Sequence, residues 1–251
     1  MAGHNKWSKV KHKKAVTDAR KSRLWARITR EIMVAAREGG GDPKGNPRLA
    51  LAIEKAKAEN MPKENIERAI KRGTGEIEGA TYEEVTYEGY APGGVAVFIE
   101  AMTDNTNRTV AEMRHLFSKA GGSLGTPGSV AYLFERKGVI EIPADGLDEL
   151  EVFEIAVEAG AEDLQQEEDS FIITTPVEHF ASVRSALQEA GIPVREANLE
   201  RIPTTTVKLS PEEAMKVARL LDVLEDHQDV QAVYSTLELD EATQAALSQN
   251  G

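Results

Sequence analysis

Residues 138–201 read GVIEIPADGLDELEVFEIAVEAGAEDLQQEEDSFIITTPVEHFASVRSALQEAGIPVREANLER, and this stretch decides the fold. Short runs of β-branched and apolar residues alternate in it with two longer patterns of helical period. The predicted elements are strand, helix, strand, strand, helix and strand, at residues 138–142, 147–159, 163–168, 171–175, 177–190 and 193–201. Such a set closes on itself, because each strand finds a partner within the set.

This βαββαβ order matches a ferredoxin-like split βαβ unit, and the segments on either side of it look incomplete. The preceding segment has predicted strands at 83–90, 94–102 and 129–135 and a helix at 104–120; the following one has strands at 204–209 and 230–238 and a helix at 210–225. Each alone would leave sheet edges and one sheet face uncovered. We therefore expect residues 80–135 and 204–240 to join as one discontinuous α/β domain. Residues 136–203 would be an inserted ferredoxin-like domain, and 241–251 a frayed tail.

Residues 1–79 are expected to form a basic helical domain with a mobile basic arm at its start. Helical periodicity, capping residues and glycine stops predict three helices, at residues 17–38, 46–59 and 62–73. The last two are separated by only one or two residues, so they must make a tight helix–turn–helix corner. The predicted class is α+β with three domains: a three-helix module, a discontinuous α/β domain and an inserted βαββαβ domain.

Composition excludes several classes of protein. With 251 residues, 41% of them hydrophobic and 29% charged, the chain is globular and long enough for roughly two average domains. Cysteine is absent, which excludes disulfide scaffolds, thiolate metal sites and a cysteine nucleophile. The longest apolar runs, among them Val95 to Ile99, are far short of the ~20 residues of a membrane helix, and the basic start lacks the apolar core of a signal peptide. We expect a cytoplasmic protein without a membrane partner.

Charge is distributed very unevenly along the chain. Residues 1–75 hold 19 Lys and Arg against 8 Asp and Glu, whereas the remaining 176 residues hold 11 against 34. The overall net charge of −12 and the pI near 5.0 conceal this basic head. Such asymmetry indicates a polyanionic partner, DNA or RNA.

The densest basic segment supplies the candidate nucleic-acid contacts. They are Lys6, Trp7, Lys9, Lys11, His12, Lys13 and Lys14, continued on the first helix by Arg20, Lys21, Arg23 and Arg27. Lysines neutralise phosphates, and an exposed indole can stack on a base. A solvated tail with Trp7 packed on the first helix and a mitochondrial transit peptide are the alternatives. The basicity that continues on the helix favours nucleic acid.

A second candidate is the loop before the helix predicted at 104–120. Asn105, Asn107 and Arg108 stand where a strand passes into a helix, so free amides together with a guanidinium could hold a phosphate, a carboxylate or a partner. An Asx-type cap with Arg108 paired to a nearby acid explains the same residues equally well. The glycine-rich segment 121–129 has the reverse order, helix then strand, and is interpreted as a connection.

Catalytic, metal and cofactor sites are not predicted. The five histidines lack metal-ligand spacing, and no nucleophile elbow or placed carboxylate pair is found. We therefore expect a non-enzyme without a metal or cofactor. The oligomeric state is left open by the sequence.

Several blocks of the sequence resemble one known family. Residues 2–14, AGHNKWSKVKHKK, resemble the start of the YebC family of probable transcriptional regulators, as do 46–49, 60–70, 88–97, 104–112 and 117–130. The resemblance implies three domains, one of them discontinuous, and a basic start typical of mature bacterial members. It implies either a DNA-binding transcriptional regulator or a translation factor, since some members act on translation, apparently at ribosomes stalled on proline-rich segments. The family supplies no catalytic residue.

These observations together predict a non-enzymatic, cytoplasmic, nucleic-acid-binding regulator of gene expression. The first hypothesis is that the protein is a DNA-binding transcriptional regulator. The alternative is a ribosome-associated translation factor or activator that acts on stalled, proline-rich translation through RNA contacts. Phosphate contacts alone do not separate the two, because they position a protein without reading sequence.

Overall fold

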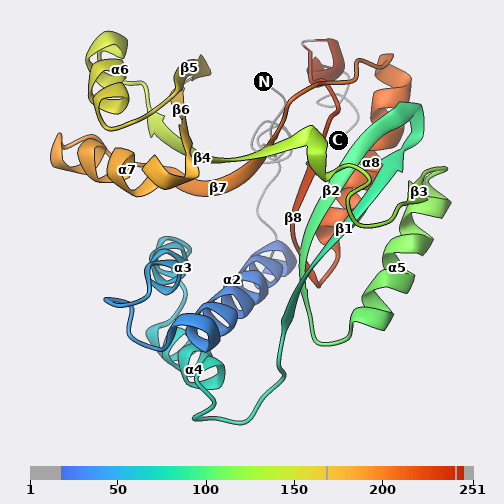
Figure 1. Ribbon diagram of the computed structural model, residues 1–251, viewed down its shortest axis with the longest axis horizontal. Helices are drawn as coiled ribbons and strands as arrows, with labels where there is room; N and C mark the ends of the chain where they lie inside the picture. The colour runs from blue at the N-terminus through green and yellow to red at the C-terminus, as the bar shows by residue number, and fades with distance from the viewer. Residues whose placement is uncertain (1–17, 168, 241, 246–251) are drawn as a thin grey trace. The chain divides into compact units, whose positions relative to one another are not determined.

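The computed structural model describes residues 18–167, 169–240 and 242–245, with side chains from residue 21 onward, and divides into two compact units (Figure 1). The second unit is Leu133–Thr205, and the first comprises the chain on either side of it. The α+β class is confirmed, with a helical N-terminal module and two antiparallel sheets. The boundaries of the three-domain division remain a prediction.

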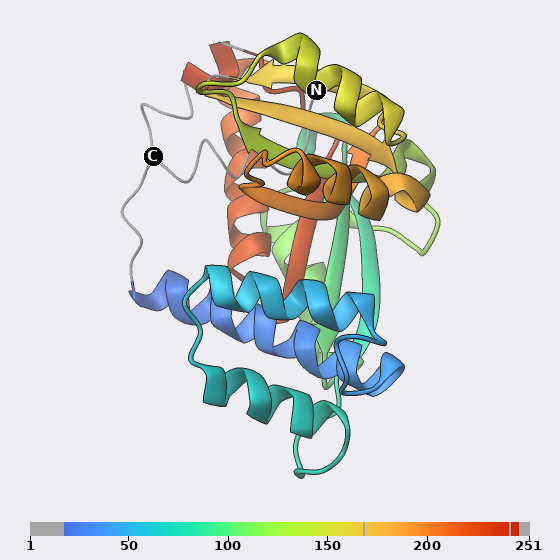
Figure 2. The same cartoon turned by 90° about the vertical axis from the view of Figure 1, so that its left-hand side faces the viewer.

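Three helices form the N-terminal part of the first unit: α2 (Asp18–Gly39), α3 (Pro47–Ala58) and α4 (Lys63–Gly73), drawn in blue to teal in Figure 2. Asn46 caps α3 as predicted, since its Oδ1 accepts a hydrogen bond from the Leu49 amide at 3.1 Å. Its Nδ2 donates to the carbonyls of Ala35 at 2.7 Å and Gly40 at 2.9 Å, which ties the end of α2 to the start of α3. The three helices enclose a common apolar core that includes Ile32.

The remainder of the first unit is built on one four-stranded sheet of order β3-β1-β2-β8. Its elements are β1 (Glu83–Ala91), the short turn η1 (Pro92–Gly94), β2 (Val95–Thr103), α5 (Thr106–Lys119), β3 (Ser123–Leu124), α8 (Pro211–Asp226) and β8 (Val230–Ser235). β8 pairs antiparallel with β2, and Ile99 faces Val233 in the register. The segments before and after residues 133–205 therefore share one sheet.

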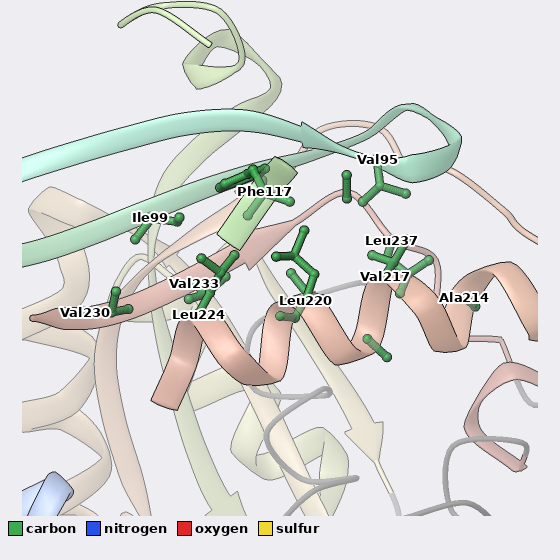
Figure 3. Packing of buried hydrophobic residues seen from close by; sticks show 14 of the residues in the cluster. Val95, Ile99, Phe117, Ala214, Val217, Leu220, Leu224, Val230, Val233 and Leu237 are labelled. Atoms are coloured by element: carbon green, nitrogen blue, oxygen red, sulfur yellow. The ribbon is translucent and has the colours of Figure 1, made fainter. Parts of the chain in front are cut away.

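Helices α5 and α8 bury their apolar faces against this sheet. Phe117 of α5 and Leu224 of α8 are completely buried, together with Val95 and Ile99 of the central strand β2 (Figure 3). All the residues of this core cluster come from outside 133–205.

The second unit has the predicted βαββαβ order. Its elements are β4 (Phe134–Pro143), α6 (Glu149–Glu158), β5 (Asp163–Glu167), β6 (Ser170–Pro176), η3 (Val177–His179), α7 (Phe180–Glu189) and β7 (Glu196–Pro203). The sheet order is β5-β6-β4-β7, antiparallel throughout, so the first strand lies between the third and the fourth. This is the split arrangement expected from the sequence.

The strand predicted at 129–135 is wrong. Residues Ala131–Leu133 form a short 3-10 turn, η2, and β4 begins only at Phe134. The cause is Glu88, a buried carboxylate on β1 that accepts hydrogen bonds from the amides of Gly128, Val130 and Ala131 at 2.7 to 2.8 Å. Those amides are therefore not available for pairing in a sheet.

The strand predicted at 204–209 is also wrong. In the described chain this segment makes a single β-bridge, between Val207 and Leu237. The Thr204 amide donates to the carbonyl of Leu133 at 2.8 Å, so this hydrogen bond joins the two ends of the second unit.

None of the described helices is both long enough and apolar enough to cross a membrane.

Candidate nucleic-acid interface

Most of the predicted contact residues lie outside the described part of the chain. Lys6, Trp7, Lys9, Lys11, His12, Lys13 and Lys14 precede residue 18, and only the backbone of Arg20 is described. Of the predicted contact residues, the structure describes the side chains of Lys21, Arg23 and Arg27, all on α2.

Lys21 is exposed, and its ammonium group lies 5.1 Å from the centre of the Trp25 ring. The Trp25 indole donates to the carbonyl of Glu59 at 3.1 Å, which fixes α2 against the end of α3. Lys21 is thus presented on an anchored helix, at a distance that allows a cation–π contact.

Arg23 and Arg27 have partners at the carboxyl end of α8. Arg23 lies 3.4 Å from the carboxylate of Asp226, and the guanidinium of Arg27 donates to the backbone carbonyl of Glu225. Burial lowers the pKa of Arg27, while the nearby acids Glu225 and Asp226 oppose that shift. These acids stand about 200 positions further along the chain, so sequence spacing could not pair them with α2.

Further exposed cations occur on the helical module, and the sequence analysis did not single them out. They are Arg37, Lys44, Lys55, Lys57, Lys63, Arg68, Lys71 and Arg72. On α4, helical periodicity places Arg68, Lys71 and Arg72 on the side opposite the buried Ile66 and Ala69. The same periodicity, read from the sequence, could have found this face.

Arg48 is a cation with an internal role. It binds Glu31 of α2 at 2.7 Å, Glu38 of α2 at 2.7 Å, and Glu84 of β1. Partial burial opposes protonation, but these carboxylates outweigh it and raise the pKa of Arg48 above its usual value. Arg48 therefore links the helices to the start of the sheet.

The loop before α5 has the contacts of a helix cap with an ion pair. Asn105 Oδ1 accepts from the Arg108 amide at 3.0 Å, and the Arg108 guanidinium lies 2.9 Å from both Asp104 and Asp229. Asn107 is exposed in the first turn of α5. These contacts match the alternative explanation of the loop, and anion binding at Asn105, Asn107 and Arg108 stays a prediction.

Asp229 is the buried end of this network, with 1% of its surface exposed. Burial alone would raise the pKa of Asp229, but hydrogen bonds from Arg108 and Thr109, both 2.9 Å long, outweigh it and hold the pKa below its ordinary value. The carboxylate is therefore ionised and stabilises the start of α5 against the loop before β8.

A possible metal-ligand group adjoins the same loop. Ligand atoms of Glu112, His227 and Asp229 lie within 4.8 Å of one another, beside a cavity of about 500 Å³ that His115 also lines. His227 Nε2 is 2.8 Å from Glu112, and Nδ1 accepts the Asp229 amide at 3.2 Å. Ligation through Nε2 would move the imidazole proton to Nδ1, where it would face that amide. The group is better suited to its present hydrogen bonds than to a metal.

Comparisons with known proteins cover nearly the whole chain. The family model described as "TACO1/YebC protein N-terminal domain" matches residues 5–76, and that described as "TACO1/YebC second and third domain" matches residues 82–237. The undescribed basic arm from residue 5 onward thus lies within the matched region.

Similar proteins have matching length. A "probable transcriptional regulatory protein" of Thermotoga petrophila is 58% identical over 96% of this chain and 95% of its own. Another, from Chlorobaculum tepidum, is 51% identical over 99% of this chain and 100% of its own. The crystal structure of a conserved hypothetical protein from Aquifex aeolicus has 52% identity and a TM-score of 0.83, covering 91% of this chain and 94% of its own. The chain belongs to the TACO1/YebC family, and its relatives from Thermotoga petrophila and Chlorobaculum tepidum are named probable transcriptional regulatory proteins.

Proposed function

We propose that this protein is a non-enzymatic, cytoplasmic regulator of gene expression that binds nucleic acid through its helical head. The observation that carries the proposal is the division of charge, with 19 cations against 8 acids in residues 1–75 and 11 against 34 in the rest. A polyanion is attracted to the first part and repelled by the second, which confines binding to the head and fixes its orientation.

Duplex DNA is the partner that we put first. Helices α3 and α4 are joined by a short connection, residues 59–62, and α4 presents Arg68, Lys71 and Arg72 on its exposed side. In the proposed complex this side of α4 lies in the major groove, where many DNA-binding proteins place a helix. The names of the relatives agree with a transcriptional role.

In this proposal the arm adds the phosphate contacts. Lys6, Lys9, Lys11, Lys13 and Lys14 would neutralise phosphates alongside α4, and Lys21 would extend the cationic surface along α2. Arg23 and Arg27 would contribute only after leaving their partners at the end of α8.

A ribosome-associated translation factor is the second candidate, and Trp7 is the residue that favours it. An aromatic ring between lysines suits unpaired bases, which are exposed in RNA loops and stacked in duplex DNA.

The two candidates are separated by recovering the tagged protein from cells after crosslinking and sequencing the bound DNA and RNA. Discrete promoter DNA supports the transcriptional function, and ribosomal RNA supports the translational one. A variant in which Lys11, Lys13 and Lys14 are changed to Ala serves as the control for contacts made through the head. Recovery of neither nucleic acid above that control would contradict the proposal as a whole.

A further inference from the structure

Helix α6 of the second unit carries an apolar stripe on its solvent side. Leu150 is 72% exposed, and Phe153 and Val157 are each 41% exposed. Their spacing of three and four residues places them in one row along the helix. The residues that attach α6 to the unit are others, Val152 and Ala156, which are almost fully buried. The stripe is therefore not needed to hold α6 in place.

An exposed row of apolar side chains is unfavourable in water. Three of the seven large apolar side chains that are exposed in the described chain lie on this one ten-residue helix. Scattered single apolar side chains need no explanation, whereas a contiguous row of them marks an interaction surface. The α6 stripe, defined as Leu150, Phe153 and Val157, therefore calls for a partner that covers it.

The charge around the stripe indicates the chemistry of that partner. Along the sequence, residues 138–183 contain 13 Asp and Glu and not one Lys or Arg, and Arg184 of α7 is the first cation after them. By helical geometry, Glu154 and Glu158 border the stripe on one side and Glu149 borders it on the other. The stripe is thus an apolar row between acidic margins.

We propose that the α6 stripe binds a cationic amphipathic helix of a partner protein. The apolar face of such a helix would cover Leu150, Phe153 and Val157, and its flanking Lys or Arg would meet the glutamates on the margins. Nucleic acid and anionic membranes are repelled by the same glutamates. A second copy of this chain, docked stripe against stripe, would bring acidic margins together. Helix α6 packs beside α7 in its unit (Figures 1 and 2), and the side chains of the stripe remain exposed.

The probe is a fluorescein-labelled synthetic peptide of Leu and Lys, patterned so that Leu falls at helical spacing on one face. Its binding to the full-length protein is followed by fluorescence anisotropy as a function of salt. A peptide of the same composition in scrambled order controls for charge attraction alone, since it cannot present an apolar face. The protein variants are Leu150→Ser with Phe153→Ser, and Glu154→Gln with Glu158→Gln.

The matched controls lie in the other unit. Val223→Ser removes an apolar side chain of α8 that is 49% exposed, and Glu78→Gln removes an exposed carboxylate. Thermal unfolding of every variant checks that the fold is kept. We expect it to be kept, because the changed side chains are exposed.

We expect the patterned peptide to bind at least tenfold more tightly than the scrambled one. The double Ser variant should lose about tenfold in affinity, as expected when two apolar side chains no longer bury against the peptide. The double Gln variant should lose severalfold and show a weaker salt dependence. The two control variants should bind like the unchanged protein.

Three results would overturn the proposal. Equal binding of patterned and scrambled peptides would mean that charge alone is recognised. A loss in Val223→Ser as large as that in the stripe variant would place the contact elsewhere. Concentration-dependent dimerisation that the stripe variant abolishes would assign the surface to a second copy of the chain.

Discussion

Asp229 and Glu88 are two buried carboxylates that the fold has to satisfy internally. Glu88 receives three backbone amides from the loop 128–131. Asp229 receives the guanidinium of Arg108 and the hydroxyl of Thr109. Both are hydrogen-bonded as anions, which is the condition under which a buried charge is tolerated.

The buried carboxylate of Asp229 predicts a specific dependence of stability on pH. Because its folded-state pKa lies below the unfolded value of about 3.9, its contribution is complete above that value and is lost as the pH falls through the folded one. Asp229→Asn should lower the free energy of unfolding by about 2 kcal/mol at pH 7 and flatten its fall in acid. Urea unfolding of both proteins at several pH values measures this.

Glu83→Gln, which changes an exposed carboxylate of β1, is the control for this series. If Asp229→Asn loses stability in acid as steeply as the unchanged protein, another group is responsible for the slope.

The limits of prediction from sequence are clearest at single residues. Asn46 could be identified as a helix cap because its partners are local. The role of Glu88 as an acceptor for three backbone amides was not predicted. Those amides lie 40 to 43 positions away, and no sequence pattern connects them with Glu88. The alternative explanation of Arg108 named the correct kind of contact, but the sequence could not name Asp229, 121 positions distant.

At the scale of elements, helices α2 and α4 are in tight contact at Gly73. A Cβ atom there would lie 2.4 Å from the Met33 carbonyl oxygen and 2.8 Å from the Ala36 Cβ. The glycine that the sequence analysis interpreted only as a helix stop is therefore also a packing position. Capping and periodicity predicted the helices. The sequence alone did not reveal the contact between α2 and α4, because residues 33 and 36 lie far from residue 73 along the chain.

Gly73→Ala should force α2 and α4 apart and lower the free energy of unfolding by about 1–3 kcal/mol, as overpacking does. Gly45→Ala is the matched control, because a Cβ at Gly45 has one neighbour, at 3.9 Å. Chemical denaturation is followed by tryptophan fluorescence, to which Trp25 of α2 contributes together with Trp7. Equal stability of the Gly73 variant and the unchanged protein would mean that the helices can separate without cost.

Strands show the complementary limit. The βαββαβ elements were predicted in order because each carries its own apolar run, and the structure pairs them as expected. The strands at 129–135 and 204–209 were wrong. Amides of the first segment bond to Glu88, and within the described chain the second segment pairs only through Val207, whose amide and carbonyl bond to Thr236 and Glu238. Apolar and β-branched residues indicate where a strand could form, but not whether its amides are already bound.

At the scale of the whole molecule, the second unit begins and ends at neighbouring points. Phe134 faces Pro203 in the register of β4 and β7, and the Thr204 amide donates to the Leu133 carbonyl. The core of the first sheet draws on no residue of 133–205. These contacts agree with an inserted domain, which stays a prediction.

Replacing residues 136–203 with a short Gly/Ser linker should leave a folded remainder. The strands β3, β1, β2 and β8 and the helices α5 and α8 are all retained. The variant should unfold cooperatively and keep the far-UV circular dichroism of helix and sheet. Gradual unfolding, with loss of the sheet signal, would show that the remainder depends on the insert.

The charge division is the central claim, and the salt dependence of binding tests it most directly. If six cations of the head touch phosphates, the slope of log affinity against log salt on duplex DNA should be about −5. Changing Lys11, Lys13 and Lys14 to Ala should flatten that slope by roughly 2 to 3 and weaken binding to all sequences alike. The control, Lys119→Ala with Lys216→Ala, removes exposed lysines of α5 and α8 and should leave the slope unchanged. A head variant that keeps the affinity and the slope of the unchanged protein would contradict the account.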